Sequence, residues 1–252
     1  MKSDDLELYR DFMKDKLRLS LDFSKTDQRR GVEMPPIQKP YPEDAKIIPL
    51  AKRSKWKNPR PVSFEEAVAN RRSHRNFSAR ALELDELAFL LWATQGLRES
   101  LNDRTVFRTV PSAGNRHAFE SYLLIRAVKG LESGLYRYLP LENALLFKGR
   151  VDGLDDKITR ATLGQSFAAE GAVVFVWASI PYRMEWRYGL AAHRVILMDV
   201  GHVCQNLYLA CEAINAGTCA VAAYDQTAMD ALIGLDGEEE FVVYLAPLGK
   251  LS

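Results

Sequence analysis

The sequence lacks the short motifs that identify several large classes of enzyme. No two of its 15 glycines are separated by a single residue, so the GxGxxG loop of dinucleotide-binding folds is absent, as is the Walker phosphate loop. The GxSxG motif of serine hydrolases and the HExxH motif of zinc proteases are missing as well. A bound nucleotide or cofactor must therefore be held by a different arrangement of residues.

Cysteine is scarce, and its positions do not indicate a metal site. Cys204, Cys211 and Cys219 form no CxxC pair and match no common zinc spacing. We expect them to be small core residues in a reducing cytoplasm. His193 and His202 are nine residues apart on one expected helix and about half a turn out of phase, so we expect no shared metal ion there either.

An excess of one charge is also missing, because 34 lysines and arginines are balanced by 33 aspartates and glutamates, for a net charge of +1. This balance argues against nucleic acid or an anionic membrane as a partner. The amino-terminal residues lack the apolar run of a secretory signal, so we expect a cytoplasmic protein. The one long apolar stretch, residues 190–216, carries several charged side chains. We expect it to be a buried helix in the core or at a subunit interface.

The length of 252 residues suffices for one sizeable α/β domain, or for a domain with an extension. We expect residues 1–62 to form an amino-terminal helix and a proline-rich extended arm, because repeated proline excludes a helix interior and a central strand. Residues 63–252 are expected to form the main domain, in which the hydrophobic pattern becomes regular.

Hydrophobic periodicity and turn residues predict the individual elements. Helices are expected at residues 4–23, 63–72, 82–96, 155–171, 190–216 and 227–235. Strands are expected at residues 121–128, 134–140, 144–149, 172–180, 218–224 and 240–249, and a loop at residues 108–120. These elements predict an α+β fold, with a central mixed or antiparallel sheet of four or five strands surrounded by helices.

The segment RRSHRNF, residues 71–77, has three arginines and a histidine within five residues. A capping-box pattern at Ser63 and Glu66 predicts a preceding helix whose last turn carries Arg71 and Arg72. Guanidinium groups fit phosphate oxygens two at a time, and the serine between the arginines adds a hydroxyl donor. The segment therefore indicates a phosphate site, with a solvated helix end as the alternative.

Several segments, in this order, resemble the nitroreductase-type FMN-dependent oxidoreductase family. The family's phosphate-binding segment is similar to RRSHRNF, its P-S-[AS]-x-N loop to PSAGNRHAFE (residues 111–120), and its long dimer-forming helix with the next strand to residues 199–225. This resemblance spans residues 63–250. A closer resemblance, to the SagB-type dehydrogenase subgroup that oxidises azoline rings in modified peptides, rests on KPYPEDAKIIPL, LLWATQGL, RTVPSAG and GLYRYLP.

The resemblance implies a nitroreductase-like fold with FMN bound at the interface of a homodimer. It implies that the phosphate and ribityl chain contact Arg71, Arg72, Ser73 and Arg75, with Lys250 as a second phosphate contact. It implies that the PSAGN loop reaches the flavin of the opposite subunit through Pro111, Ser112, Ala113, Gly114 and Asn115. It also implies that the flavin ring near N5 meets the backbone of Val221, Ala222 and Ala223.

The implied activity is hydride transfer from NAD(P)H through flavin N5 to a small electron-poor acceptor, such as a nitroaromatic, a quinone or an enone, without an obligatory catalytic side chain. The alternatives are a SagB-type azoline (thiazoline or oxazoline) peptide dehydrogenase and a flavin-binding scaffold without turnover. Azoline oxidases usually carry a Lys-Tyr pair where this chain has Arg187 and Tyr188, and arginine is a poor base. These two residues line the expected substrate pocket, or else serve core packing or a surface ion pair. His117 either donates to an acceptor or stands exposed beside the PSAGN loop.

Overall fold

The computed structural model describes residues 3–102 and 105–252. The helices are α1 (Ser3–Phe12), α2 (Phe64–Asn70), α3 (Leu84–Gln95), α4 (Leu154–Ala161), α5 (Phe167–Glu170), α6 (Tyr182–Tyr188), α7 (Ala192–Glu212) and α8 (Gln226–Ile233). The strands are β1 (Ile47–Pro49), β2 (Leu97–Asn102), β3 (Thr105–Arg108), β4 (Phe119–Ile125), β5 (Gly134–Leu139), β6 (Ala144–Gly149), β7 (Val173–Ser179), β8 (Ala216–Thr218) and β9 (Phe241–Lys250). These elements confirm the expected α+β class.

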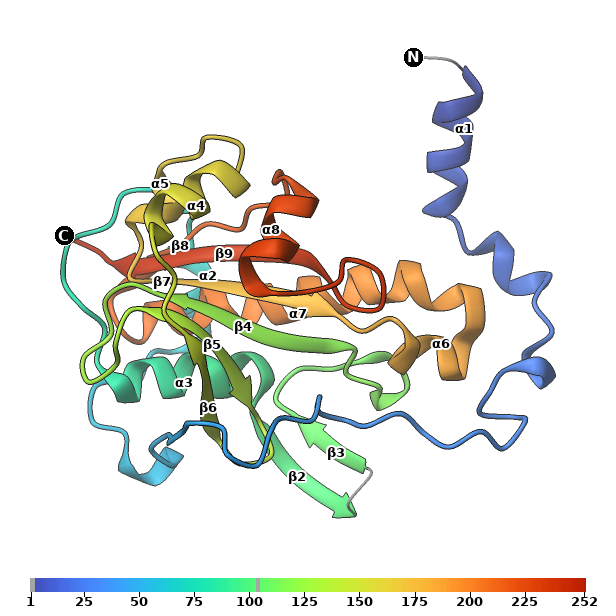
Figure 1. Cartoon of the computed structure of the whole chain (residues 1–252), viewed down its shortest axis with the longest axis horizontal. Coiled ribbons are helices and arrows are strands. Elements are labelled where there is room, and N and C mark those ends of the chain that lie inside the picture. Colours follow the sequence, from blue (N-terminus) through green and yellow to red (C-terminus); the bar gives the residue numbers. More distant parts are fainter. Residues whose placement is uncertain (1–2, 103–104) are drawn as a thin grey trace.

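The centre of the molecule is a large sheet with helices on both faces (Figure 1). Within the described residues it has seven strands in the order β1-β6-β5-β4-β7-β9-β8, and each neighbouring pair is antiparallel. The hairpin of β2 and β3 stands apart from this sheet. The two central strands, β4 and β7, are buried along their whole length, as expected for strands covered on both faces.

Two apolar layers lie on either side of the sheet. Side chains alternate along β7, so that Phe175 and Trp177 face α3 and α7, whereas Val174 and Val176 face α4, α5 and α8. The three cysteines belong to the buried interior and are free thiols, in agreement with their expected role as core residues. Helix α7, which was expected to be a buried or interface helix, packs its apolar face on the first of these layers.

The sheet has more strands than the four or five expected, because short strands join both of its edges. Strand β1 comes from the proline-rich arm and pairs with β6, and its proline is tolerated because an edge strand leaves one side unpaired. The strand expected at residues 218–224 is displaced: β8 ends at Thr218, after which Val221 forms an isolated bridge with Leu245. The β2–β3 hairpin was not expected at all.

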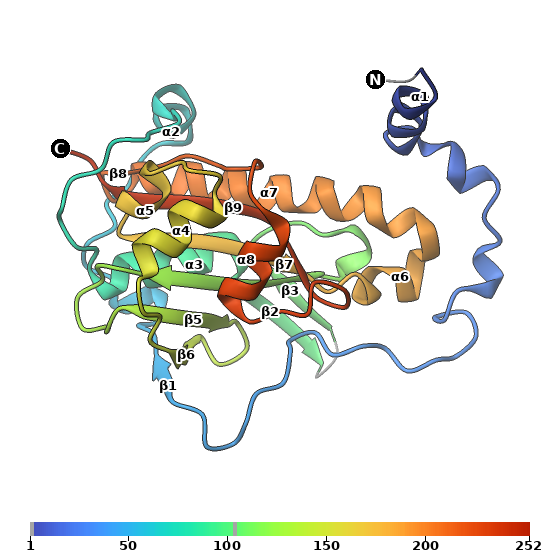
Figure 2. The ribbon, with the colours of Figure 1, turned by 45° about the horizontal axis from the view of Figure 1, so that its top comes forward.

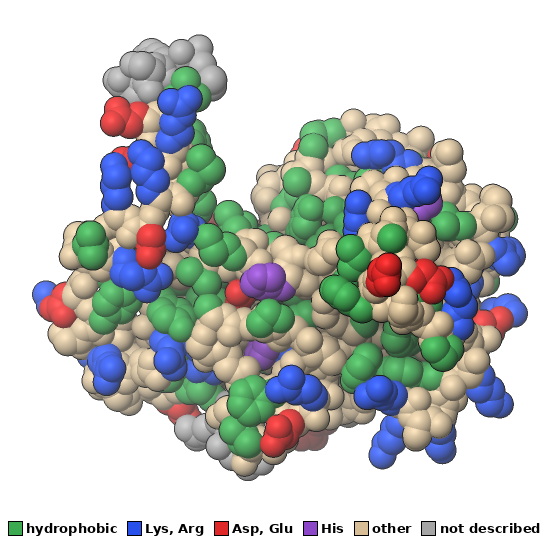
Figure 3. Space-filling view, turned by 180° about the vertical axis from the view of Figure 1, so that it is seen from behind, with side chains coloured by type: hydrophobic (Ala, Val, Ile, Leu, Met, Phe, Trp, Pro, Cys, Tyr) green, Lys and Arg blue, Asp and Glu red, His purple; other side chains and the backbone are tan. Residues whose placement is uncertain are grey.

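The amino-terminal helix is shorter than expected and stands clear of the body. It ends at Phe12, and a 3-10 turn at Asp15–Leu19 replaces the rest of the expected helix. Figure 3, a view from behind, shows this segment projecting beside the body with a notch between them. Helix α2 begins after the Ser63 cap as expected but ends at Asn70, so the arginines follow the helix and do not lie in its last turn. No helix of the described residues is long and apolar enough to cross a bilayer.

Candidate functional site

The arginine-rich segment leaves α2 and runs along the edge strand β8. The His74 N–H donates to the Thr218 carbonyl at 2.9 Å, and Ser73 forms a parallel bridge with Thr218. This close approach requires glycine at position 217, because a Cβ there would lie 2.6 Å from the His74 Cβ. Gly249 admits Phe77 in the same way, with 2.8 Å between a Cβ at 249 and the Phe77 Cβ. The absence of side chains at Gly217 and Gly249 therefore allows the segment to lie close against the sheet.

Within the described residues, the guanidinium groups of Arg71, Arg72 and Arg75 have no hydrogen-bond acceptor. None of them donates a hydrogen bond to a residue in the described ranges, and none forms a salt bridge there. Two of them lie over aromatic rings: Arg71 is 5.4 Å from the Tyr208 ring of α7, and Arg75 is 5.7 Å from the Phe167 ring of α5. The Ser73 hydroxyl lies 3.0 Å from the Tyr208 hydroxyl. The cluster thus offers several free donors to an anion, which is what a phosphate site needs.

The residues after β8 lie beside this cluster. The Tyr208 hydroxyl accepts a hydrogen bond from the Ala220 N–H at 2.8 Å, which links the arginine segment to the backbone that leads to Val221. Val221 is buried, whereas Ala222 and Ala223 are exposed, and the N–H groups of these two alanines donate to no described residue. Small side chains and free amides at this position fit the close approach of a flat ring.

Lys250 lies at the same end of the molecule but is engaged elsewhere. Its ammonium group donates to the carboxylate of Glu86 in α3 and to the Ile214 carbonyl, and only 12% of the side chain is exposed. A phosphate contact would require the lysine to leave this buried carboxylate, so its role in binding stays a prediction.

The PSAGN loop is anchored near the other end of α7. The Ala113 N–H donates to Asp199 Oδ2 at 3.0 Å, and the Ser112 hydroxyl accepts from the His117 N–H at 2.9 Å. Burial raises the pKa of Asp199, although the hydrogen bonds from the loop oppose this shift. Gly114 has φ of +57° and lies directly against the Tyr188 hydroxyl and the Arg187 side chain, so a larger residue would collide with both.

His117 is buried, and the expectation that it stands exposed is wrong. Its side chain is enclosed, with 3% of the residue exposed, and its Nε2 lies 2.8 Å from Asn115 Oδ1. Burial and the nearby charges of Arg108, Arg116 and Arg183 lower its pKa from 6.5 to about 2. The imidazole is therefore neutral and tied to the loop, which leaves no ring N–H for an external acceptor in this arrangement.

A buried ion network lies beneath the loop. Glu120 accepts from Arg183 at 2.6 Å and lies 3.8 Å from Arg137 Nε. Arg108 donates to the Gln95 side chain at 2.8 Å, and burial together with the charge of Arg183 lowers its pKa to about 10. Buried charges of this kind are stable only when they are paired and hydrogen-bonded.

One chain thus collects the predicted residues in two groups. Arg71, Ser73 and the Ala220 N–H contact Tyr208 of α7. The PSAGN loop is bonded to Asp199 of the same helix and contacts Arg187 and Tyr188 through Gly114. Tyr208 and Asp199 are nine residues apart on α7, or about 14 Å along the helix axis. Figure 2 shows the same separation, with α2, β8 and the carboxyl terminus at one end and α6 at the other.

Sequence reasoning missed the residues that hold these groups in place. The sequence indicates only that Tyr208 belongs to an apolar helix and that Asp199 is a polar residue within it. Tyr208 contacts the arginine segment and Asp199 contacts the PSAGN loop. Nothing in the sequence around either residue predicts these contacts.

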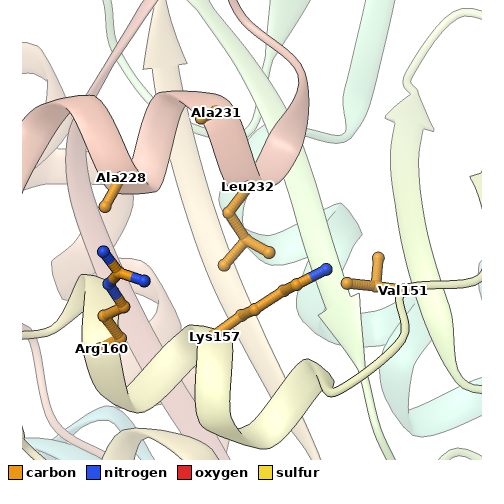
Figure 4. A pocket seen from close by; sticks show the side chains of 6 residues that line it. All are labelled: Val151, Lys157, Arg160, Ala228, Ala231 and Leu232. Atoms are coloured by element: carbon orange, nitrogen blue, oxygen red, sulfur yellow. The ribbon is translucent and has the colours of Figure 1, made fainter.

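Another pocket, of about 340 Å³, lies between α4 and α8 on the opposite face of the sheet from α7. Its wall consists of Val151, Lys157, Arg160, Ala228, Ala231 and Leu232. Figure 4 shows Arg160 and Lys157 extending from α4, with Arg160 reaching toward Ala228 of α8. It contains none of the residues predicted for the site.

Comparison with known proteins gives a consistent family match. The model of the Nitroreductase family matches residues 68–250. A protein of Methanocaldococcus jannaschii that is named as a nitroreductase is 31% identical over 191 residues, which cover 75% of this chain and 91% of that protein.

Solved structures show the same fold. A structure from Anabaena variabilis, also described as a nitroreductase, has a TM-score of 0.61 and 26% identity over 74% of this chain, which spans only 37% of the Anabaena chain. A structure of the E. coli microcin synthetase McbBCD complex, with truncated pro-MccB17 bound, has a TM-score of 0.59 and 18% identity. That match covers 100% of this chain and 95% of the other, so the likeness in fold includes the amino-terminal arm.

Proposed function

Because this chain belongs to the nitroreductase family of oxidoreductases, we propose that it binds FMN and transfers electrons from NAD(P)H to a small electron-poor acceptor, such as a nitroaromatic, a quinone or an enone. The observation that carries the proposal is the set of guanidinium groups at Arg71, Arg72 and Arg75, which pair with no residue that the structure describes and lie beside an exposed serine hydroxyl. A flavin mononucleotide brings a phosphate with a charge of roughly −1.5 to −2, which these groups would neutralise.

The chemistry of the donor set fits FMN. In our proposal Arg71 and Arg75 grip the phosphate, Ser73 donates its hydroxyl to the same oxygens, and the Tyr208 and Phe167 rings hold the two guanidinium groups apart. The free N–H groups of Ala222 and Ala223 lie where a flat ring can approach without meeting a large side chain. When bound, FMN would supply hydride transfer at its N5, so the chain itself needs to position the reactants and exclude competing reactions.

We also propose that two copies of the chain share the flavin sites. The face of α7 that carries Leu197, Met198 and Gly201 is open: the first two side chains are 48% and 47% exposed, and a Cβ at Gly201 would touch nothing. Two α7 helices packed antiparallel through this face would bring the PSAGN loop of one protomer toward the arginine segment of the other. Light scattering of the purified protein tests this proposal, since a monomeric mass would contradict it.

The experiment that tests the function has two parts. The purified protein is expected to show a flavin absorbance spectrum, and anaerobic addition of NADH or NADPH is expected to bleach it promptly. The double variant Arg71→Ala with Arg75→Ala should fold but lose FMN, whereas Arg53→Ala with Arg150→Ala, which removes two exposed arginines elsewhere, should retain it. Full FMN content in the first double variant would mean that the phosphate is held by other residues. If neither NADH nor NADPH reduces the bound flavin, the result would instead indicate a flavin-binding scaffold.

A second candidate function is a SagB-type azoline dehydrogenase that works within a multiprotein assembly. The structural match to the microcin synthetase complex covers the whole of this chain, including the arm. This likeness in fold is the observation that favours the second candidate. Arg187 argues against it, because a guanidinium stays protonated where proton removal needs a base. Oxidation of a thiazoline-containing peptide by the purified flavoprotein would favour this candidate over the small-acceptor reductase.

A further inference from the structure

A pocket of about 280 Å³ lies between the amino-terminal arm and the end of α6. Its lining consists of Arg18, Phe23, Thr26, Gln28, Arg29, Arg187 and Tyr188. Three of these seven residues are arginines and none is acidic, in a chain whose total charge is close to zero. The pocket is therefore a local concentration of positive charge beside two aromatic rings.

The arm side of the pocket is fixed to the body by hydrogen bonds. The Gln28 N–H donates to the Trp186 carbonyl and the Trp186 indole N–H donates to the Val32 carbonyl, each at 2.9 Å. The Tyr182 hydroxyl donates to Asp27 Oδ2, also at 2.9 Å. Backbone and side-chain bonds on both sides of Arg29 thus hold this part of the arm in place against α6.

The positive charge of the pocket is only partly compensated by its surroundings. Arg18 is paired with Asp15 at 2.7 Å, but the guanidinium groups of Arg29 and Arg187 form no salt bridge or hydrogen bond with a residue that the structure describes. Arg116, only 7% exposed, lies over the Trp186 ring at 5.2 Å, also without a described carboxylate partner. Burial and then the charge of Arg187 lower the pKa of Arg116, as expected where positive charges face one another.

The pocket borders the loop that we propose to lie against the flavin. A Cβ at Gly114 would lie 2.8 Å from both Cδ and Nε of Arg187, so the arginine side chain rests on the PSAGN loop. Tyr188, the other pocket residue of α6, touches the same glycine through its hydroxyl. A ligand held here would therefore lie next to that loop.

We propose that this pocket recognises a carboxylate on a small aromatic acceptor, with Arg29 and Arg187 as its charge partners and Phe23 and Tyr188 as its apolar walls. Guanidinium groups bind carboxylates through paired hydrogen bonds, and aromatic walls favour a flat ring over a flexible chain. The volume suits a single substituted ring. The assignment of this ligand as the electron acceptor rests on the proposed function, whereas its binding to the pocket does not.

The test compares two ligands that differ in charge and little in shape, 4-nitrobenzoate and 4-nitrobenzamide, by calorimetric titration of the protein as purified. We expect the carboxylate to bind about tenfold more tightly than the amide, and this preference to weaken as salt is added. Arg29→Gln and Arg187→Gln should each reduce the affinity for the carboxylate by about three- to tenfold and leave that for the amide nearly unchanged. Arg187→Lys, which retains the charge, should keep a preference for the carboxylate.

The matched control is Arg30→Gln, because Arg30 is the exposed neighbour of Arg29, pairs with Asp27 and does not line the pocket. Equal binding of acid and amide, or equal losses in the Arg29 and Arg30 variants, would overturn the proposal. If 4-nitrobenzoate competes kinetically with NADPH and not with a second electron acceptor, the proposal is overturned. The pocket would then bind the phosphates of the nicotinamide dinucleotide. A protein that prefers the carboxylate but holds no reducible flavin would refute the proposed function and leave the binding site standing.

Discussion

His117 should make the stability of this protein depend on pH in a way that can be calculated. The folded protein keeps its imidazole neutral, because burial and three arginine charges lower its pKa from 6.5 to about 2. In the unfolded chain the same group takes up a proton below pH 6.5. Its contribution to stability is therefore complete above the unfolded pKa and is lost as the pH falls, because only the unfolded chain gains the proton.

The size of this loss follows from linkage between protonation and unfolding. At about pH 5 the unfolded histidine is almost fully protonated, and the free energy of unfolding falls by about 2 kcal/mol relative to about pH 7.5. This figure hardly depends on the folded pKa as long as that pKa stays well below the pH of the measurement. A loss of this size is a substantial share of the stability of an ordinary domain.

The assay is urea unfolding at several pH values, for the wild type and for His117→Asn. Asparagine cannot titrate, and it tolerates the positive φ of 46° that the backbone adopts at this position. The variant should lose about 2 kcal/mol less than the wild type between the two pH values, whatever its stability near neutrality. Parallel pH curves for the wild type and His117→Asn would refute the buried, arginine-surrounded environment described above.

Two further substitutions test how the loop and the ion network are built. Glu120→Gln should destabilise the fold by about 3–5 kcal/mol in urea unfolding, because it leaves the buried guanidinium of Arg183 without its carboxylate; the surface change Glu132→Gln should cost less than about 1 kcal/mol. Gly114→Ala should cost about 1–3 kcal/mol more than Gly234→Ala, since both have positive φ but only the first places a methyl group against Tyr188. Equal costs at the two glycines would contradict the contact. So would the absence of any recovery of stability when Tyr188→Phe is added to Gly114→Ala.

The predictable parts of the fold are those decided by local chemistry. The Ser63 hydroxyl accepts from the Glu66 N–H at 3.0 Å, and α2 begins after this cap. Helix α3 ends at Gln95 with Gly96 as its C-cap, because helix ends depend on neighbours a few residues away. Strand β1 could not be foreseen, since its partner β6 lies about a hundred residues further along the chain. The displacement of β8 has a similar cause: apolar residues after Thr218 look like a strand, but they leave the sheet beyond Val221.

The candidate site likewise has parts that the sequence predicts and parts that it does not. RRSHRNF and PSAGN are visible in the sequence because they combine unusual charge or turn residues in short segments. Asp199 and Tyr208, which hold these segments, have no local signal that distinguishes them from other polar residues on a long helix. The exposure expected for His117 failed for a tertiary reason, because the loop folds inward over an ion network whose members come from β3, β4, β5 and α6.

The identity of residue 187 links the fold to the choice of substrate. A lysine at this position could lose its proton after burial and act as a base, but an arginine remains a fixed positive charge throughout the physiological pH range. Here the Arg187 side chain lies against the PSAGN loop and, with Arg29 of the arm, lines a pocket whose lining includes no acidic side chain. A fixed charge in this position can attract and orient an anion but cannot remove a proton from the substrate. The arm, which lies outside residues 68–250, therefore supplies half of the charge that would select a carboxylate, and Arg187 supplies the other half.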